Sequence, residues 1–316
     1  MNRMNKKFRI VFMGTPNFSV FPLYLLHKNG YEVPLVVTQP DRRKGRGRKL
    51  LPPPVKVTAV ELGYEVAQPA SMKSDAFAER IRDIRPDLFV VVAFGHILPA
   101  SLLSIPRLGA INIHASLLPK YRGPAPIQWA IIKGEKESGV TTMFMDKGLD
   151  TGDILLTEKT DITPDDTAAS LHDRLSLMGA DLLIRTLKAF EDEEITPVLQ
   201  DHSQATYAPM LSKKDGHLNW KKSANALESF IRGMTPWPGA FTFHGDNRLK
   251  IFKAELISSD SDAAPGTVLR GFSNELRIAT GDGALSVLEI QGASGKRLLI
   301  RNFLRGHSIP VGTVLT

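Results

Sequence analysis

The fold class is decided by two apolar runs, Phe8-Arg-Ile-Val-Phe-Met-Gly14 and Leu88-Phe-Val-Val-Val-Ala93. Their continuous hydrophobicity is typical of strands that are covered on both faces. Strand-like and helix-like patterns alternate around them. Helices are expected at 17–28, 54–63, 75–85, 126–133 and 167–190, with further strands at 31–38, 64–67, 110–115, 140–145 and 154–160. This alternation predicts an α/β fold with a doubly wound, mainly parallel, Rossmann-like sheet.

The pattern changes after Ile195. Residues 195–212 show little periodicity and many polar residues, and this indicates a linker. A short helix is expected at 223–234, and from Gly239 onward short β-type segments are separated by Gly, Asp, Asn and Ser, which predicts a small β-barrel or sandwich. Of these two we expect an OB-like β-barrel. A chain of 316 residues is long enough for two domains. We therefore expect a catalytic domain at 1–194, a linker at 195–212 and a β-barrel domain at 213–316.

The composition excludes several classes of protein. With 42% hydrophobic and 23% charged residues the chain is ordinary globular protein rather than a disordered or fibrous one. Cysteine is absent, which excludes disulfides, a thiol nucleophile and thiolate metal sites and fits a cytoplasmic location. No apolar run approaches the roughly 20 residues that cross a bilayer. The apolar run after the basic start is short and strand-like, so no signal peptide is expected.

The net charge of +7 is unevenly distributed. Residues 39–56 hold seven Lys or Arg against one Asp, residues 208–316 hold 14 against 9 Asp or Glu, and the remainder is mildly acidic. A polyanionic partner such as nucleic acid would meet one loop and one domain. The alternative is that these charges are ordinary solvated surface residues. For the C-terminal half the sequence favours neither interpretation over the other. For the loop Asp41–Lys49 a polyanion contact is favoured, because packing gives no reason to gather so many like charges.

The segment Ala110-Ile-Asn-Ile-His-Ala-Ser116 holds the densest chemical signal. Alternate side chains of a strand share a face, so Asn112, His114 and Ser116 should point one way. Open α/β sheets bind ligands at the carboxyl ends of their strands, which is where these polar residues fall. The alternative is a polar sheet edge whose hydrogen bonds are satisfied within the protein.

Two loops follow this strand. Residues 117–126 contain three prolines, so their shape is largely preset and suits a flat ligand that must be held still. The loop 146–153 brings carboxylates after another candidate strand. Asp146, Asp150 or Asp153 could each reach His114 and set its protonation state, and the residues alone do not choose among them.

Missing motifs limit the chemistry. Met13-Gly-Thr-Pro16 lacks the three-glycine dinucleotide fingerprint, and the chain has no Walker-type phosphate loop, no paired-histidine metal helix and no serine elbow. No nucleotide cofactor and no metal are therefore expected. Asn, His and Asp without a nucleophile suit direct transfer between two substrates. Asn112 and His114 would donate hydrogen bonds to a developing oxyanion.

At these residues the chain resembles the 10-formyltetrahydrofolate-dependent formyltransferases. The resemblance rests on Asn-x-His at 112–114, Ser-Leu-Leu-Pro-Lys-Tyr-Arg-Gly at 116–123 and Leu-Asp-Thr-Gly-Asp at 149–153. Met-Gly-Thr-Pro at 13–16, Gln-Pro-Asp at 39–41 with its basic insert, and Thr-Pro-Trp-Pro-Gly-Ala at 235–240 extend it along the chain. The match is closest to the branch that formylates the methionine of charged initiator tRNA.

The resemblance implies a catalytic trio of Asn112, His114 and Asp150, and so selects one of the three aspartates. The amine of the acceptor would attack the formyl carbon carried on N10 of the folate. Asn112 and a protonated His114 would stabilise the oxyanion, while Asp150 keeps His114 charged. The pterin pocket would be lined by Ser116, Leu117, Leu118 and Pro119, with Phe94, Gly95, His96 and Ile97.

The resemblance also implies the partners. 10-Formyltetrahydrofolate would be the formyl donor and a co-substrate, with no metal, no nucleotide cofactor and no membrane involved. The acceptor end of a charged initiator tRNA would meet the basic loop, and the β domain would hold tRNA phosphates. A monomer is expected. Within the loop Arg42 is the first candidate, followed by Arg43, Lys44, Arg46, Arg48 and Lys49.

Other functions are compatible with parts of the sequence. Glycinamide ribonucleotide formyltransferase resembles only the first domain. Sugar-nucleotide formyltransferases and the hydrolase portion of formyltetrahydrofolate dehydrogenase share both domains but would not need the cluster from Arg42 to Lys49. A non-catalytic RNA-binding module is supported by charge alone and leaves Asn112 and His114 without a role.

Overall fold

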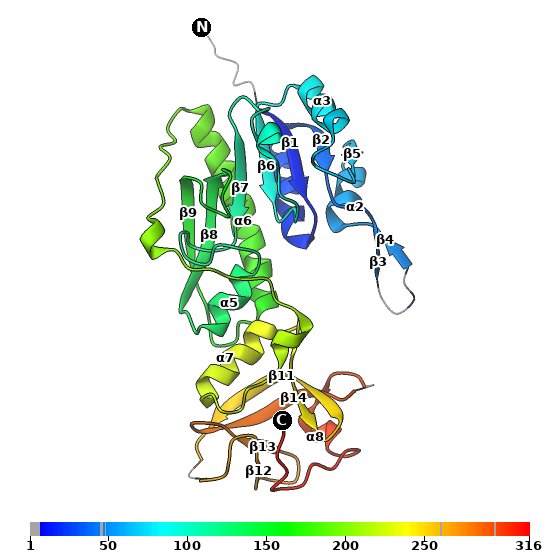
Figure 1. Ribbon diagram of the computed structural model, residues 1–316, viewed down its shortest axis with the longest axis vertical. Helices are drawn as coiled ribbons and strands as arrows, with labels where there is room; N and C mark the ends of the chain where they lie inside the picture. The colour runs from blue at the N-terminus through cyan, green and yellow to red at the C-terminus, as the bar shows by residue number, and fades with distance from the viewer. Residues whose placement is uncertain (1–6, 45–46, 48, 260, 294) are drawn as a thin grey trace. The chain divides into compact units, whose positions relative to one another are not determined.

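The computed structural model describes residues 7–44, 47, 49–259, 261–293 and 295–316. The chain forms two compact units (Figure 1). One comprises Met1–Gly123, Ser138–Thr160 and His172–Tyr207, and the other comprises Pro124–Glu137, Asp161–Leu171 and Ala208–Thr316. In the described ranges, no helix is both long enough and apolar enough to cross a membrane.

The first unit is built on a seven-stranded sheet in the order β5-β2-β1-β6-β7-β8-β9. Neighbouring strands from β5 to β7 pair in parallel, whereas β8 is antiparallel to β7. The strands are β1 (Arg9–Gly14), β2 (Glu32–Val37), β5 (Val66–Ala67), β6 (Leu88–Val92), β7 (Ala110–His114), β8 (Glu137–Phe144) and β9 (Ile154–Asp161). The predicted Rossmann-like, mainly parallel sheet is confirmed.

Helices cover this sheet because its central strands are apolar on both faces. Every residue of β6 is buried. Phe77 and Ile81 of α3 join a core with Val11, Phe89 and Val91. The helices are α1 (Val20–Lys28), α2 (Pro54–Glu61), α3 (Asp75–Ile84), α4 (Ala100–Leu103) and α6 (Ala168–Glu191).

Helix α6 approaches β7 closely at Gly179. A Cβ atom there would lie 2.9 Å from Cγ2 of Ile113. Ile113 lies between Asn112 and His114 and projects from the opposite face of β7. The helix therefore supports the strand that carries the predicted site.

The helix expected at 17–28 is present, but it does not begin as an α-helix at Asn17. Asn17–Ser19 form a 3-10 turn, and the α-helix begins at Val20. The Ser19 hydroxyl donates to the carbonyl of Val92 at 2.6 Å instead of capping α1. The demands of packing against β6 thus override the local capping pattern.

The basic segment expected as a loop contains a β-hairpin. β3 (Arg42–Lys44) and β4 (Lys49–Leu51) pair antiparallel, with Arg42 opposite Leu51 and Arg43 opposite Leu50. They form a separate two-stranded sheet (Figure 1). A run of charged residues with no alternation of apolar side chains carries no strand signal, so the prediction missed it.

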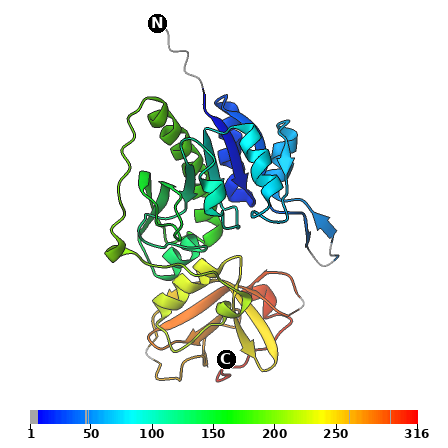
Figure 2. The same cartoon turned by 45° about the horizontal axis from the view of Figure 1, so that its top comes forward.

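The second unit contains a six-stranded antiparallel sheet that is curled (Figure 2). The prediction of a small C-terminal β-barrel is confirmed in this curled form. Its strands are β10 (Ala240–His244), β11 (Asn247–Ile257), β12 (Val268–Leu269), β13 (Leu276–Ala279), β14 (Ala284–Gln291) and β15 (Leu298–Leu299). The last strand and α8 (Ile300–Phe303) were not expected from the sequence.

Two helices pack together in the second unit. They are α5 (Pro126–Ile132) and α7 (Ala224–Met234). A Cβ atom at Gly233 would lie 2.6 Å from Cγ1 of Ile132, so the glycine permits the close approach of these helices. Leu227 and Ile231 of α7 join the core beneath the curled sheet.

Of the segment 195–212, expected to be a linker, residues 195–207 belong to the first unit and contact its other parts. Val198 forms a backbone bridge with Ile154, and Tyr207 forms one with Arg122. A 3-10 turn, η2, occupies His202–Gln204. The side chain of Gln200 is buried, with 6% of its surface exposed. These contacts bring the segment next to the loop that follows β7.

Candidate active site

The carboxyl end of β7 carries the predicted polar face. Asn112 and His114 alternate with the buried residues Ile111 and Ile113. Asn112 lies opposite Val91 of β6 and Met143 of β8, so β7 is paired on both sides. Asn112 is half-buried, while the side chain of His114 is only 6% exposed. Both side chains therefore belong to one face of an interior strand, as the sequence predicted.

The hydrogen bonds of His114 define the roles of its two ring nitrogens. Nε2 lies 2.9 Å from the backbone carbonyl oxygen of Tyr121. A carbonyl oxygen can only accept, so Nε2 carries the proton in this contact. Nδ1 faces the carboxylate of Asp150, at 3.6 Å from Oδ2. Nδ1 is therefore the nitrogen that is left to exchange a proton with a reacting group.

The two hydrogen-bonding or ion-pair partners of His114 have unusual backbone conformations. Tyr121 has φ of 61° and Asp150 has φ of 55°, both in the left-handed region. Each such conformation in a residue other than glycine costs about 1–3 kcal/mol and persists only when its surroundings impose it. The backbone N–H of Tyr121 donates to Oγ1 of Thr206 at 2.8 Å. The Asp150 carboxylate accepts the N–H of Gly123 at 2.7 Å.

The structure separates the three candidate aspartates. Asp146 accepts hydrogen bonds from the N–H of Gly148 at 2.9 Å and the hydroxyl of Thr151 at 2.7 Å. Its carboxylate thus closes the turn of its own loop. Asp150 is the aspartate that reaches His114, and Asp153 gives no ion pair with His114 within the described residues. The family resemblance implied the same aspartate, and its catalytic role stays a prediction.

The loop after β7 is fixed by local hydrogen bonds. Ser116 is buried, and its hydroxyl donates to the carbonyl of Lys120 at 2.6 Å. The hydroxyl of Thr141 donates to the carbonyl of Ser116 at 2.7 Å, and the N–H of Leu118 is 3.3 Å from that same hydroxyl. Leu117 packs over Gly139, where a Cβ would lie 2.5 Å from its Cδ2. These hydrogen bonds fix the backbone of the loop that directly follows His114 and includes Pro119.

The second predicted folate segment, Phe94–Ile97, follows β6. The hydroxyl of Thr15 donates to the carbonyl of Phe94 at 2.9 Å. Nε2 of Gln39 donates to the carbonyls of Phe94 at 3.0 Å and Gly95 at 3.2 Å. Phe94 is buried, but the side chain of Ile97 is 93% exposed. His96 is also exposed, with its ring edge against Phe94.

These contacts assign a structural role to two sequence motifs. Thr15 belongs to Met-Gly-Thr-Pro and Gln39 to Gln-Pro-Asp. Both tie the loop after β6 in place. Gly95 has φ of 75°, and a Cβ there would lie 2.5 Å from Nε2 of Gln39. Neither motif predicts these contacts from the sequence alone.

A polar cluster holds the start of the basic hairpin. Nζ of Lys56 lies 2.8 Å from Oδ2 of Asp41 and 2.8 Å from Oε1 of Gln68. Nε2 of Gln68 donates to Oδ1 of Asp41 at 2.7 Å and to the carbonyl of Gln39 at 2.8 Å. The hydrogen bonds from Lys56 and then from Gln68 lower the pKa of Asp41. The carboxylate therefore stays ionised at neutral pH.

The predicted tRNA-binding residues are only partly described. Arg42, Arg43 and Lys49 are exposed on the hairpin strands. Lys44 is placed on β3 by its backbone. Arg46 and Arg48 lie outside the described residues.

Sequence reasoning missed two buried residues beside the site. Arg122 is 2% exposed and contacts the side chain of Gln200. Arg122 was quoted only as part of a family motif. No periodicity or motif drew attention to Gln200, because it lies in a polar segment without a regular pattern.

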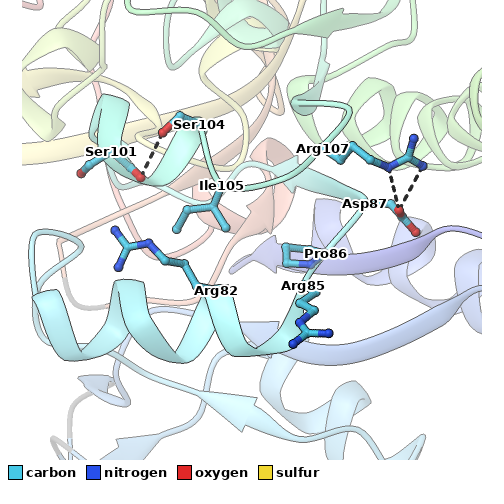
Figure 3. A pocket seen from close by; sticks show the side chains of 8 residues that line it. All are labelled: Arg82, Arg85, Pro86, Asp87, Ser101, Ser104, Ile105 and Arg107. Atoms are coloured by element: carbon cyan, nitrogen blue, oxygen red, sulfur yellow. Dashed lines mark hydrogen bonds and ion pairs between the residues drawn. The ribbon is translucent and has the colours of Figure 1, made fainter.

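A hollow of about 580 Å³ lies elsewhere in the first unit (Figure 3). It is lined by Arg82, Arg85, Pro86, Asp87, Ser101, Ser104, Ile105 and Arg107. This hollow adjoins the beginning of β6, whereas the predicted site lies beyond the ends of β6 and β7. Arg107 pairs with Asp87 at 3.1 Å, and Arg82 lies in the last turn of α3, where helix carbonyls attract cations.

In the described parts of the chain, no group of three His, Cys, Asp or Glu residues could hold a metal ion.

Family models match both parts of the chain. A model described as formyl transferase matches residues 8–187. A second, described as formyl transferase, C-terminal domain, matches residues 210–308. The chain thus belongs to the formyl transferases.

Proteins of similar sequence indicate the branch of the formyltransferases to which this chain belongs. A methionyl-tRNA formyltransferase of Caldanaerobacter subterraneus subsp. tengcongensis is 49% identical over 97% of this chain and 99% of its own length. A methionyl-tRNA formyltransferase of Desulfotalea psychrophila is 51% identical, with 98% and 96% covered. The chain belongs to the methionyl-tRNA formyltransferase family.

Solved structures share the fold at lower identity. An N-formyltransferase from Helicobacter canadensis, in complex with folinic acid and dTDP-3-aminofucose, has a TM-score of 0.66 at 20% identity, with 92% of this chain and 100% of that chain covered. HypX from Aquifex aeolicus in complex with tetrahydrofolic acid has a TM-score of 0.61 at 18% identity. This chain is covered to 94% in that comparison and spans about half (47%) of the HypX chain.

Proposed function

We propose that this chain transfers the formyl group of 10-formyltetrahydrofolate to the α-amino group of methionine on charged initiator tRNA. The observation that carries the proposal is the arrangement of Asn112, His114 and Asp150 at the end of β7. Membership of the methionyl-tRNA formyltransferase family supports this acceptor. The product would be the formylated aminoacyl-tRNA used in translation initiation.

In the proposed reaction the amine attacks the formyl carbon directly. The carbonyl oxygen then becomes an oxyanion, and the side-chain amide of Asn112 and Nδ1–H of protonated His114 donate hydrogen bonds to it. The attacking nitrogen loses a proton, the bond between the formyl carbon and N10 breaks, and N10 takes up a proton. The products are the N-formyl amine and tetrahydrofolate, so no oxidant, metal or covalent enzyme intermediate is needed.

The contacts of His114 support its part in this scheme. Tyr121 anchors Nε2, so the ring cannot turn its other nitrogen away from the reacting groups. Asp150 lies 3.6 Å from Nδ1, so a proton on this nitrogen would face the carboxylate. At that distance a proton on Nδ1 is not fully engaged by the carboxylate and is available to a substrate oxygen.

The donor would bind between two loops that follow adjacent strands. Ser116, Leu117, Leu118 and Pro119 follow β7, and Phe94, Gly95, His96 and Ile97 follow β6. The strands are parallel neighbours, so both loops leave the same edge of the sheet. The hydrogen-bonded loop after β7 and the exposed side chain of Ile97 suit the flat, largely apolar faces of a pterin ring.

The acceptor would be held by positive charge. Exposed Arg42, Arg43 and Lys49 on the hairpin, together with Lys44, Arg46 and Arg48, would contact phosphates at the acceptor end of the tRNA. The domain at 213–316 would hold the tRNA body, with 1–194 as the catalytic domain and 195–212 as the connection between them. We further propose that the protein acts as a monomer in the cytoplasm.

The direct test is incubation of the purified chain with 10-formyltetrahydrofolate and methionyl initiator tRNA. The expected result is a formylated, hence blocked, α-amine on the methionine. A parallel reaction with dTDP-3-aminofucose as the acceptor separates this activity from that of the sugar formyltransferases. Formylation of the amino sugar without formylation of the tRNA would overturn the proposal.

A further inference from the structure

Gln200 spans the gap between the loop after β7 and the turn that carries Asp150. Its amide nitrogen donates to the carbonyl oxygens of Asp150 at 2.9 Å and Gly152 at 2.7 Å. Its oxygen Oε1 accepts from Nε of Arg122 at 3.1 Å and from Nη2 at 2.6 Å. Both donors and both acceptor positions of the amide are occupied. The orientation of the side chain is therefore fixed at both ends.

Arg122 is a buried cation with neutral partners. Only 2% of its surface is exposed. Beyond Gln200, Nη2 lies 3.0 Å from Nδ1 of His202. A guanidinium can only donate, so Nδ1 of His202 accepts. Burying a guanidinium is costly unless its donors are satisfied, and here these contacts tie the loop after β7 to the segment around Gln200.

Three consecutive residues of this loop serve the site in different ways. The carbonyl of Tyr121 receives the Nε2–H of His114, the side chain of Arg122 holds Gln200, and the N–H of Gly123 donates to the Asp150 carboxylate. Asp150 is thus held from two sides. Its carboxylate is bound through Gly123 and its main chain through Gln200.

We propose that Gln200, locked in place by Arg122, is a positioning residue for Asp150. It binds the carbonyls on either side of Thr151 and so keeps Asp150 in its left-handed conformation, with the carboxylate facing Nδ1 of His114. The segment beyond residue 195 thereby becomes part of the active-site structure rather than a passive connection. This inference rests on the proposed function, in which Asp150 acts on His114.

The test is the substitution Gln200→Glu. The new carboxylate keeps oxygen acceptors for Arg122 and gains an ion pair with it, so folding should be retained. The carboxylate lacks the two N–H donors of the amide. One of its oxygens would instead face, and repel, the carbonyl oxygens of Asp150 and Gly152. The turn of Asp150 should shift, and a displacement of about 1 Å near reacting groups costs roughly 10²-fold in rate.

The expected result is a fall in kcat of about 10²-fold with KM values for folate and tRNA unchanged. Gln204→Glu is the matched control, because Gln204 is exposed in the same segment and the charge change is identical. It should keep wild-type kcat. Normal kcat in Gln200→Glu, or equal losses in the two variants, would overturn the inference.

A second readout separates this inference from the proposed function. The imidazole signals of His114, identified by their loss in His114→Ala, can be followed by NMR without any substrate. They should move in Gln200→Glu and stay in place in Gln204→Glu. If the wild-type chain fails to formylate tRNA, the proposed function fails, while unmoved His114 signals in Gln200→Glu would independently defeat the positioning role.

Discussion

The imidazole of His114 lies between the carbonyl oxygen of Tyr121, 2.9 Å from Nε2, and the carboxylate of Asp150, 3.6 Å from Nδ1. The shorter contact fixes the ring, and the longer one leaves the second nitrogen free to meet a substrate. Both partners adopt left-handed backbone conformations. Strain of this kind at a site is typical of preorganised catalytic groups.

The substitution His114→Ala should reduce turnover by about 10²-fold or more, because it removes one donor to the oxyanion. Formylation rates at saturating folate and tRNA measure the effect, and circular dichroism verifies the fold. His27→Ala, at an exposed position of α1, is the control and should keep normal turnover. Near-normal turnover of His114→Ala would remove this residue from the mechanism.

The substitution Arg42→Ala should raise KM for tRNA and leave the affinity for folate unchanged, because the side chain of Arg42 is exposed on the basic hairpin. Losing one phosphate contact should also reduce the slope of log affinity against log salt by about 1. Arg82→Ala, on α3, is the control and should change neither value. Equal losses of tRNA and folate binding would show that the hairpin has been assigned to the wrong substrate.

Lys56→Met should release the start of the hairpin. Lys56 and Gln68 lower the pKa of Asp41, so their contacts stabilise the folded hairpin above the ordinary carboxyl pKa and are lost as pH falls through the lowered value. In Lys56→Met the pKa of Asp41 should rise, and KM for tRNA should increase without a change in kcat. NMR titration of the Asp41 carboxylate measures the first effect.

Lys73→Met is the control for that experiment, since Lys73 is exposed and lies outside the cluster. It should alter neither the Asp41 titration nor the KM for tRNA. An unchanged Asp41 pKa in Lys56→Met would mean that Gln68 alone holds the carboxylate.

The sequence predicted the parallel sheet because β1 and β6 are apolar on both faces, and it predicted the site because Asn112 and His114 interrupt such a pattern on a third strand. The carboxylate beside His114 could not be chosen from spacing, since the choice depends on the left-handed turn at Asp150. Gln200 was missed for a similar reason. Its role arises from a contact across 50 residues of chain, and no local pattern records such a contact.

The hairpin and the start of α1 were also not predicted correctly from the sequence. The strands β3 and β4 pair through their backbones, and their side chains show no periodicity that would predict them. At Ser19, a hydrogen bond to Val92 of a distant strand replaces the local cap. In both cases contacts or backbone pairing outweigh the local side-chain preferences on which sequence reasoning depends.

The close approach of α6 to β7 should make the site sensitive to bulk at Gly179. In Gly179→Val the new Cβ, 2.9 Å from Cγ2 of Ile113, would force the helix and strand apart. Overpacking of this kind costs about 1–3 kcal/mol of unfolding free energy. Since Ile113 lies between Asn112 and His114, turnover should fall as well. Urea unfolding and formylation assays measure the two effects.

Gly295→Val is the control, because a Cβ atom at Gly295 meets no atom within 4 Å, and it should change neither stability nor turnover. Wild-type stability and turnover in Gly179→Val would show that β7 does not depend on this contact.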